Sequence, residues 1–324
     1  MSSSPARVSS HVAIIGCGSV GATIAFAVLT KGLASTVSMY DLNGQRATAE
    51  VADLTHGLEF VSAATVRGGD DLEVCRDADV VIITAGAKQH PGESRLDLAA
   101  TNAAMIRWLM PELLHMAPDA VVLVVTNPVD VLTDLAVQVA TEVADVAPGR
   151  VFGSGTVLDT SRFRYVLAER CGVAVQNVHA YIVGEHGDSE LALWSSAMIG
   201  GVPIDAFMGP DGTPLSVPEQ DDLVAGVRDA ARSIIAGKGA TNWAIGLATA
   251  RILEAILRDE RRVLPVSGPV SGLVKGREIC LSLPRIVGAD GCGPVLPTQL
   301  DESELAHLES SAQQIQSVVD SVSA

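Results

Sequence analysis

His186 stands among small and acidic residues in segment 181–188, between two apolar runs. Histidine has an ordinary pKa near neutral pH, so this residue type suits proton transfer. An arginine can hold a carboxylate through two parallel hydrogen bonds. Together with a glycine-rich dinucleotide loop near the start of the chain, these residue types predict hydride transfer on a 2-keto or 2-hydroxy acid. The other polar positions that fit this chemistry are Asp41, Gln89, Arg95, Asn127, Asp159 and Arg162.

The glycine-rich loop GCGSVG occupies residues 16–21, after a predicted strand at 11–16 and before a predicted helix at 22–29. Its glycines allow a tight turn and let a pyrophosphate approach the helix N-terminus. Asp41 ends the second predicted strand, 20 residues after Gly21. An acidic residue there accepts hydrogen bonds from the ribose hydroxyls and repels a 2′-phosphate, which favours NAD over NADP. The alternative is a glycine turn with only a packing role. The candidate cofactor-binding residues are Gly16, Gly18, Val20, Gly21, Asp41 and Asn127.

Asp159 and Arg162 are three positions apart on a helix predicted at 156–169, so they share one face. Taken alone they could be a surface ion pair that contributes less than about 1 kcal/mol. His186 could be a core histidine or a metal ligand. The sequence has no HExxH motif, and His179 lies seven residues away on a predicted strand, so no metal site is predicted.

Two segments follow predicted buried strands at the edge where open α/β sheets bind ligands. Loop 86–95 contains Gln89 and Arg95 and has the composition of a lid, although an ordinary solvated loop could look the same. Asn127 comes before Pro128, where its amide could contact cofactor or substrate, or could simply belong to a turn.

The elements that position these residues differ between the two halves of the chain. Apolar runs at 11–16, 36–41, 80–84 and 121–126 alternate with helical patterns, which predicts a doubly wound parallel sheet of the α/β (Rossmann) class in a domain of residues 1–150. Residues 151–324 predict a mixed α+β substrate domain. Its expected elements are helices at 156–169, 221–235 and 243–258, a strand at 177–183, short strands within 263–295, and a terminal helix capped by Asp301 and Glu304.

Composition excludes several classes of protein. The chain has 324 residues, 48% of them hydrophobic, and a formal net charge of -16. Such an acidic surface disfavours nucleic acid and anionic lipid as partners. No apolar run approaches the ~18 residues of a membrane span, and no signal peptide is recognised, so a cytoplasmic location is expected. The five scattered cysteines predict no disulfide framework.

The chain resembles the NAD-dependent lactate and malate dehydrogenase family over nearly its full length. The resemblance is carried by GCGSVGA, TAGAKQHPGESR, TNPVD, LDTSRFR, VGEHGD and KGATNWAIG, in that order. It implies that His186 exchanges the proton, Asp159 orients it, Arg162 holds the substrate carboxylate and Arg95 polarises the carbonyl. It also implies that Asn127 contacts cofactor and substrate, that Thr241 lines the pocket and that Ile245 lies beside the nicotinamide.

Within this family, substrate choice turns on Gln89. Malate dehydrogenases carry arginine at this position to neutralise a second carboxylate, and a neutral glutamine would leave that charge unpaired. Glu93 adds negative charge to the same loop. We therefore expect pyruvate and L-lactate as substrates, with malate dehydrogenase or a broader 2-hydroxy acid dehydrogenase as the alternative. A protein that binds NAD without catalysis is the alternative from another class.

A narrower resemblance concerns regulation. Bacterial lactate dehydrogenases activated by fructose 1,6-bisphosphate carry an arginine and a histidine at the positions of Arg164 and His179. The resemblance implies an allosteric site at these two residues and a homotetramer. The alternative is that Arg164 only pairs with a nearby acid.

Overall fold

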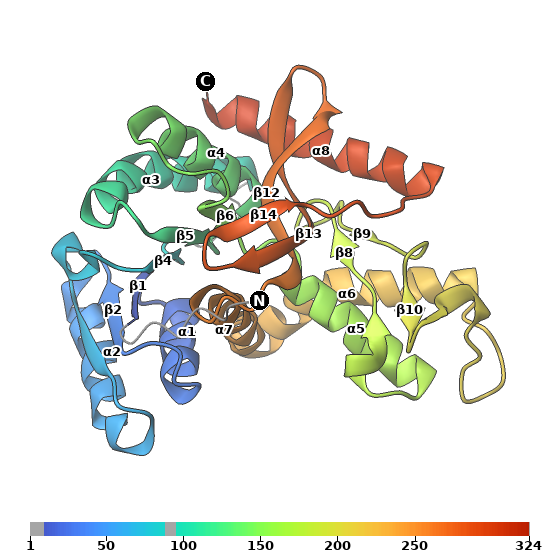
Figure 1. Ribbon diagram of the computed structural model, residues 1–324, viewed down its shortest axis with the longest axis horizontal. Coiled ribbons are helices and arrows are strands. Elements are labelled where there is room, and N and C mark those ends of the chain that lie inside the picture. The colour runs from blue at the N-terminus through green and yellow to red at the C-terminus, as the bar shows by residue number, and fades with distance from the viewer. Residues whose placement is uncertain (1–9, 88–94, 324) are drawn as a thin grey trace.

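This computed structural model describes residues 10–87 and 95–323, apart from the side chains of Arg95 and Ser323. Its centre is a nine-stranded sheet in the order β14-β13-β12-β6-β5-β4-β1-β2-β3 (Figure 1). The strands from β6 to β3 in this order are all parallel, while β12, β13 and β14 are antiparallel. The first-half strands are β1 (His11–Ile15), β2 (Thr36–Tyr40), β3 (Thr65–Gly69), β4 (Val80–Ile83), β5 (Val121–Val124) and β6 (Val151–Gly153).

Helices cover both faces of this sheet. The first-half helices are α1 (Ser19–Thr30), α2 (Gly44–His56), α3 (Arg95–Met116) and α4 (Val129–Val143). Those of the second half are α5 (Val157–Cys171), α6 (Val217–Lys238), α7 (Trp243–Leu257) and α8 (Glu302–Ser323). Helices α3, α4 and α8 pack on one face, and α1 and α7 pack on the other.

The apolar runs become strands because successive side chains alternate between these two layers. Val81 and Ile83 of β4 join the core under α3 and α4, while Val80 and Ile82 join the core under α1 and α7. Burial of each such side chain stabilises the fold by about 1.5–3 kcal/mol. The predicted doubly wound α/β domain is confirmed.

The second half adds smaller sheets and a separate core around α5. The short strands are β7 (Val178–His179), β8 (Ile182–Val183), β9 (Leu191–Ala192), β10 (Met198–Ile199) and β11 (Val202–Pro203). The predicted continuous strand at 177–183 is wrong: β7 pairs with β10, whereas β8 pairs with β9 in a different sheet.

The prediction of only short strands within 263–295 is also wrong. The structure has long strands β12 (Arg262–Val274) and β13 (Arg277–Gly288), followed by the short β14 (Gly291–Val295). Pro265 and Pro284 face each other in the ladder, so prolines that read as breaks lie inside paired strands. The sheet continues across residue 150 because β5 pairs with β6, which in turn pairs with β12. The division into domains 1–150 and 151–324 stays a prediction.

The capping of α8 follows the sequence. The backbone N–H of Glu304 donates to the Asp301 carboxylate at 2.8 Å, and the N–H of Asp301 donates to Glu304 at 3.1 Å. This reciprocal pair satisfies backbone groups that the helix itself leaves without partners. Within residues 10–87 and 95–323, no helix combines the length and apolar character that a membrane crossing requires.

Candidate active site

A cavity of about 920 Å³ opens at the carboxyl ends of the parallel strands. The loops after β1, β2, β4 and β5 line it, and so do α5 and the segment between α6 and α7. The predicted site residues in its wall are Gly16, Gly18, Val20, Gly21, Asp41, Asn127, Arg162, His186 and Thr241, together with Ile245. Gln89 lies outside the described residues. Arg95 begins α3, but its side chain lies outside them too.

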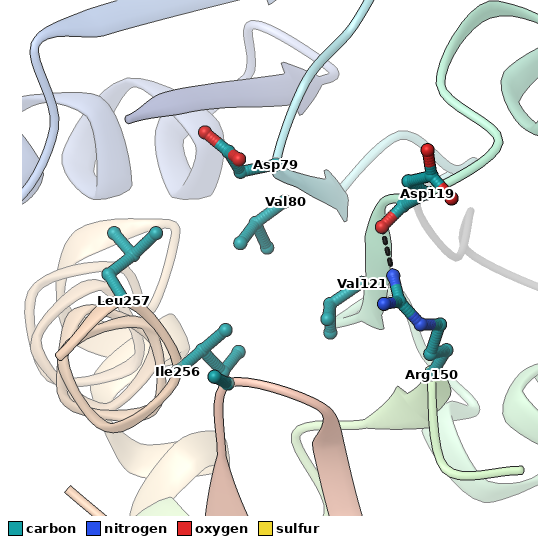
Figure 2. Close-up of a pocket in the computed structure, with 8 residues that line it drawn as sticks. Asp79, Val80, Asp119, Val121, Arg150, Ile256 and Leu257 are labelled. Carbon is teal, nitrogen blue, oxygen red and sulfur yellow. Dashed lines mark hydrogen bonds between the residues drawn. The ribbon is translucent and has the colours of Figure 1, made fainter. Parts of the chain in front are cut away.

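A second hollow lies at the opposite ends of β4 and β5, beside Val80 and Val121 (Figure 2). The Arg150 guanidinium donates there to the backbone carbonyl of Asp119. Its volume of about 10 Å³ is close to that of one water molecule. The large cavity is therefore the candidate site.

The glycine loop is shaped to admit a phosphate. A Cβ on Gly21 would lie 1.9 Å from the carbonyl oxygen of Gly16, so only glycine fits there. A Cβ on Gly18 would meet no atom within 4 Å, which leaves open space beside the start of α1. Helix α1 has no side-chain cap and no acidic residue in its first turn. Its N-terminal N–H groups are therefore suited to bind a pyrophosphate.

The Asp41 carboxylate is fixed in the same wall of the cavity. The backbone N–H of Cys17 donates to its Oδ2 at 2.8 Å, and that of Asn43 donates to Oδ1 at 2.9 Å. Two backbone donors hold the carboxylate in one orientation, where its remaining lone pairs can accept from ribose hydroxyls. The residues present thus fit a dinucleotide without a 2′-phosphate.

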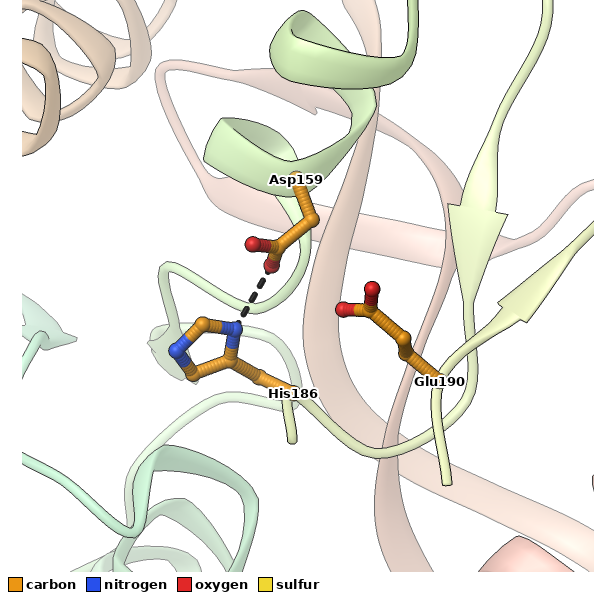
Figure 3. Close-up of side chains that lie close together, drawn as sticks. All are labelled: Asp159, His186 and Glu190. Carbon is orange, nitrogen blue, oxygen red and sulfur yellow. Dashed lines mark hydrogen bonds and ion pairs between the residues drawn. The ribbon is translucent and has the colours of Figure 1, made fainter. Parts of the chain in front are cut away.

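His186 and Asp159 form a close pair (Figure 3). The His186 Nδ1 and the Asp159 Oδ2 lie 2.6 Å apart, and the Asp159 side chain is only 2% exposed. The negative charge of Asp159 raises the pKa of His186 to about 9, against the opposing effect of burial. Burial disfavours the charged form of Asp159, but the charges of His186 and Arg162 and their hydrogen bonds prevail and lower its pKa. The pair therefore favours a protonated imidazole at neutral pH, with Nε2 as the remaining ring nitrogen.

Arg162 holds the other oxygen of the same carboxylate. Its Nη1 donates to Asp159 Oδ1 at 2.9 Å, while Nη2 is buried and has no hydrogen-bond partner among the described residues. Arg162 also lines the cavity. A buried guanidinium nitrogen without a partner is costly, so this arrangement suits an anionic ligand that would accept from it.

Two residues that sequence reasoning missed hold the site in place. Asp130 Oδ2 accepts the backbone N–H of His186 at 2.7 Å, and its Oδ1 accepts the hydroxyl of Ser282 at 2.9 Å. Asn102 is 1% exposed; it donates to the backbone carbonyl of Asn127 at 2.9 Å and accepts from the N–H of Ala87 at 2.8 Å. The TNPVD motif contains Asp130, which was the available signal, whereas Asn102 is one polar residue in a long helix.

The predicted allosteric pair lies away from this cavity. Arg164 Nε donates to the backbone carbonyl of Ala180 at 2.8 Å, and its guanidinium stacks on Tyr181 at 4.8 Å. His179 is exposed on β7, one residue before Ala180. Within the described ranges no ion pair joins Arg164 to an acid.

Comparison with known proteins decides the family. A model of the lactate/malate dehydrogenase NAD-binding domain matches residues 10–153, and a model of the lactate/malate dehydrogenase α/β C-terminal domain matches residues 156–324. The chain belongs to the lactate/malate dehydrogenase family. The predictions of NAD as cofactor and of an NAD-dependent dehydrogenase are thereby confirmed.

Individual proteins that are similar to this chain point to the same family. The chain is 44% identical over 303 residues to an L-lactate dehydrogenase of Bifidobacterium animalis, covering 93% of each chain. It is 46% identical over 309 residues to an L-lactate dehydrogenase of Synechococcus sp., covering 95% of this chain and 98% of the relative. The solved structure of a minor L-lactate dehydrogenase from Enterococcus mundtii superposes with a TM-score of 0.91 at 38% identity, covering 98% of this chain and 99% of that one. A lactate dehydrogenase from a Medee basin deep-sea metagenome library gives a TM-score of 0.91 at 35% identity, with the same coverage.

Proposed function

We propose that this dehydrogenase interconverts pyruvate and L-lactate. One observation carries the proposal: His186 and Arg162 are bonded to opposite oxygens of one Asp159 carboxylate, and both line the cavity that contains the glycine loop. A proton donor and a carboxylate-binding group are thus fixed relative to each other. The names of the similar proteins support the L-lactate assignment.

The chain's own residues would share the work as follows. NADH, held by the glycine loop and Asp41, would supply the hydride for the keto carbon. Arg162 holds the substrate carboxylate and so orients the keto group toward His186. Nε2 of His186 donates the proton to the carbonyl oxygen, while Asp159 keeps Nδ1 protonated and stabilises the imidazolium beforehand. Arg95 would stabilise the negative charge that develops on that oxygen.

The choice of pyruvate over oxaloacetate rests on Gln89 and Glu93, which supply no positive charge for a second carboxylate. The test is turnover of pyruvate and of oxaloacetate, followed by NADH absorbance. We expect pyruvate to be preferred, and Gln89→Arg to move the preference toward oxaloacetate. Preference of the unmodified protein for oxaloacetate would make it a malate dehydrogenase instead. Turnover of neither, with NADH still bound, would support the non-catalytic alternative.

We propose that fructose 1,6-bisphosphate activates the enzyme at Arg164 and His179. The Arg164 guanidinium donates to the backbone carbonyl of Ala180, and the exposed His179 directly precedes Ala180 in the chain. An arginine and a histidine there suit a phosphate. Pyruvate kinetics should respond to the sugar bisphosphate, and Arg164→Gln should abolish the response. An unchanged saturation curve in the unmodified protein would dismiss the site.

For the assembly and location we propose a homotetramer in the cytoplasm. Large apolar side chains are exposed on neighbouring helices: Phe26 of α1 is 56% exposed, Trp243 of α7 is 63% and Leu247 of α7 is 57%. Such surfaces support association between copies. All five cysteines are free and buried, which fits a reducing compartment.

A further inference from the structure

Glu190 lies behind the proton-donating pair rather than in the cavity wall. Its side chain is in the segment between β8 and β9 and is 2% exposed. Figure 3 shows its carboxyl group turned toward Asp159 and His186. A carboxylate oxygen of Glu190, a carboxylate oxygen of Asp159 and a ring nitrogen of His186 all lie within 4.8 Å of one another. Glu190 Oε1 is buried and has no hydrogen-bond partner among the described residues. A buried, unpartnered acid beside a catalytic pair calls for an explanation.

The same three residues have the donor types of a metal site, but we do not take them as metal ligands. His186 Nδ1 already bonds Asp159, and Asp159 also bonds Arg162. A metal ion would have to displace both interactions. The cluster is better explained by its protons.

The charged groups around Glu190 come from every packed element. Helix α5 contributes Asp159 and Arg162. The segment between β8 and β9, which contains Glu190 itself, contributes His186, and α6 contributes Arg228. Arg228 Nη2 donates to the backbone carbonyl of Glu190 at 2.7 Å, and His307 of α8 faces Arg228 in turn.

These surroundings make Glu190 a weak acid. Burial raises the pKa of Glu190 to about 8, and the negative charge of Asp159 adds to this effect; the charges of His186, Arg228 and Arg162 oppose it. Glu190 is therefore mostly protonated and neutral at pH 7. The pKa of His186 is raised as well, to about 9, so both groups hold their protons at pH 7 and lose them in alkaline solution.

We propose that Glu190 is a positioning residue that extends the upper pH limit of His186 protonation beyond what Asp159 provides, by gaining a negative charge behind the imidazole as the pH rises. This inference rests on the proposed role of His186 in pyruvate reduction. At neutral pH the neutral carboxyl of Glu190 leaves the carboxylates of Asp159 and Asp130 as the negative charges that act on His186. In mildly alkaline solution the charge on Glu190 forms and holds the proton on His186 longer.

The test substitutes Glu190→Gln, which keeps the size and removes the ionisation. Glu185→Gln is the matched control, since it lies in the same loop but bonds the hydroxyl of Ser189. The imidazole of His186 is titrated by NMR and identified by its absence in His186→Asn. We expect its pKa to fall by about one unit in Glu190→Gln and to stay in place in Glu185→Gln. The alkaline limb of kcat/KM for pyruvate should move by the same amount, while the neutral-pH rate changes little.

An unchanged His186 titration in a folded Glu190→Gln protein would overturn the proposal. If that variant does not fold, infrared spectroscopy of the unmodified protein decides: a buried protonated carboxyl band at pH 7 that disappears near pH 8 is expected, and its absence overturns the proposal. Failure of the unmodified protein to turn over pyruvate would instead contradict the proposed function. The two outcomes can be told apart because the NMR titration of His186 needs no activity.

Discussion

Arg162 lines the cavity; the Nη1 of its guanidinium donates to Asp159, while its Nη2 is buried and has no hydrogen-bond partner among the described residues. A lysine has one ammonium and cannot reproduce this planar fork. We expect Arg162→Lys to lower kcat/KM for pyruvate by roughly 100- to 1000-fold, which corresponds to about 3–4 kcal/mol. NADH affinity, measured by fluorescence titration, should change little. A loss of activity below about fivefold would mean that Arg162 does not hold the substrate.

Asp159 sets the pH dependence of the reaction. Because its charge raises the pKa of His186 above the ordinary value, the protonated imidazole and its contribution to stability are fully present below about pH 6.5 and are lost as the pH rises through about 9. Asp159→Asn should move the alkaline limb of pyruvate reduction down by about two pH units. Steady-state rates across pH measure this, with Asp53→Asn on exposed α2 as the control. An unmoved limb would remove Asp159 from the account.

At this scale the sequence supplied residues that the structure brings together at the cavity, but not those that support them. His186, Asp159 and Arg162 could be grouped because their types imply one chemistry. Asp130 and Asn102 bond backbone groups of distant segments. The TNPVD motif includes Asp130 but does not reveal its partner, and nothing in the sequence distinguishes Asn102 from other polar residues of its helix. Glu190 was missed because burial, and not its type, gives it significance.

At the scale of elements, the turn from β1 into α1 contains two glycines with different expected roles, Gly21 in packing and Gly18 in cofactor binding. Gly21→Ala would drive a methyl group into the Gly16 carbonyl, and we expect a loss of about 2–4 kcal/mol of folding stability. Gly18→Ala meets no neighbour, so stability should stay within about 0.5 kcal/mol, while NADH binding weakens because the methyl group occupies the phosphate space. Thermal unfolding and NADH titration of both variants measure this. Normal NADH binding by Gly18→Ala would contradict the assigned role of the loop.

The elements that could be predicted are those encoded by local patterns. The strands β1, β2, β4 and β5 were recognised as continuous apolar runs, and α8 was recognised from its capping residues and apolar face. The division of segment 177–183 between two sheets depends on its partners β10 and β9, which lie farther along the chain. The length of β12 and β13 likewise depends on their pairing, which holds prolines that a local reading treats as breaks.

At the scale of the whole molecule, the exposed apolar side chains of α1 and α7 imply association. We expect light scattering to give four times the 33.5 kDa of one chain. Phe26→Glu should lower the mass of the assembly measured in solution, because it places a charge on a surface that the assembly would bury. A single-chain mass for the unmodified protein at micromolar concentration would exclude the homotetramer.

In the proposed reaction His186 donates the proton to a substrate that Arg162 holds. The most direct measurement is the rate of NADH oxidation by pyruvate in His186→Asn, with NADH affinity determined on the same sample. We expect a rate at least about 1000-fold below that of the unmodified protein and an unchanged NADH affinity. A His186→Asn protein that still reduces pyruvate at a comparable rate would contradict this role of His186.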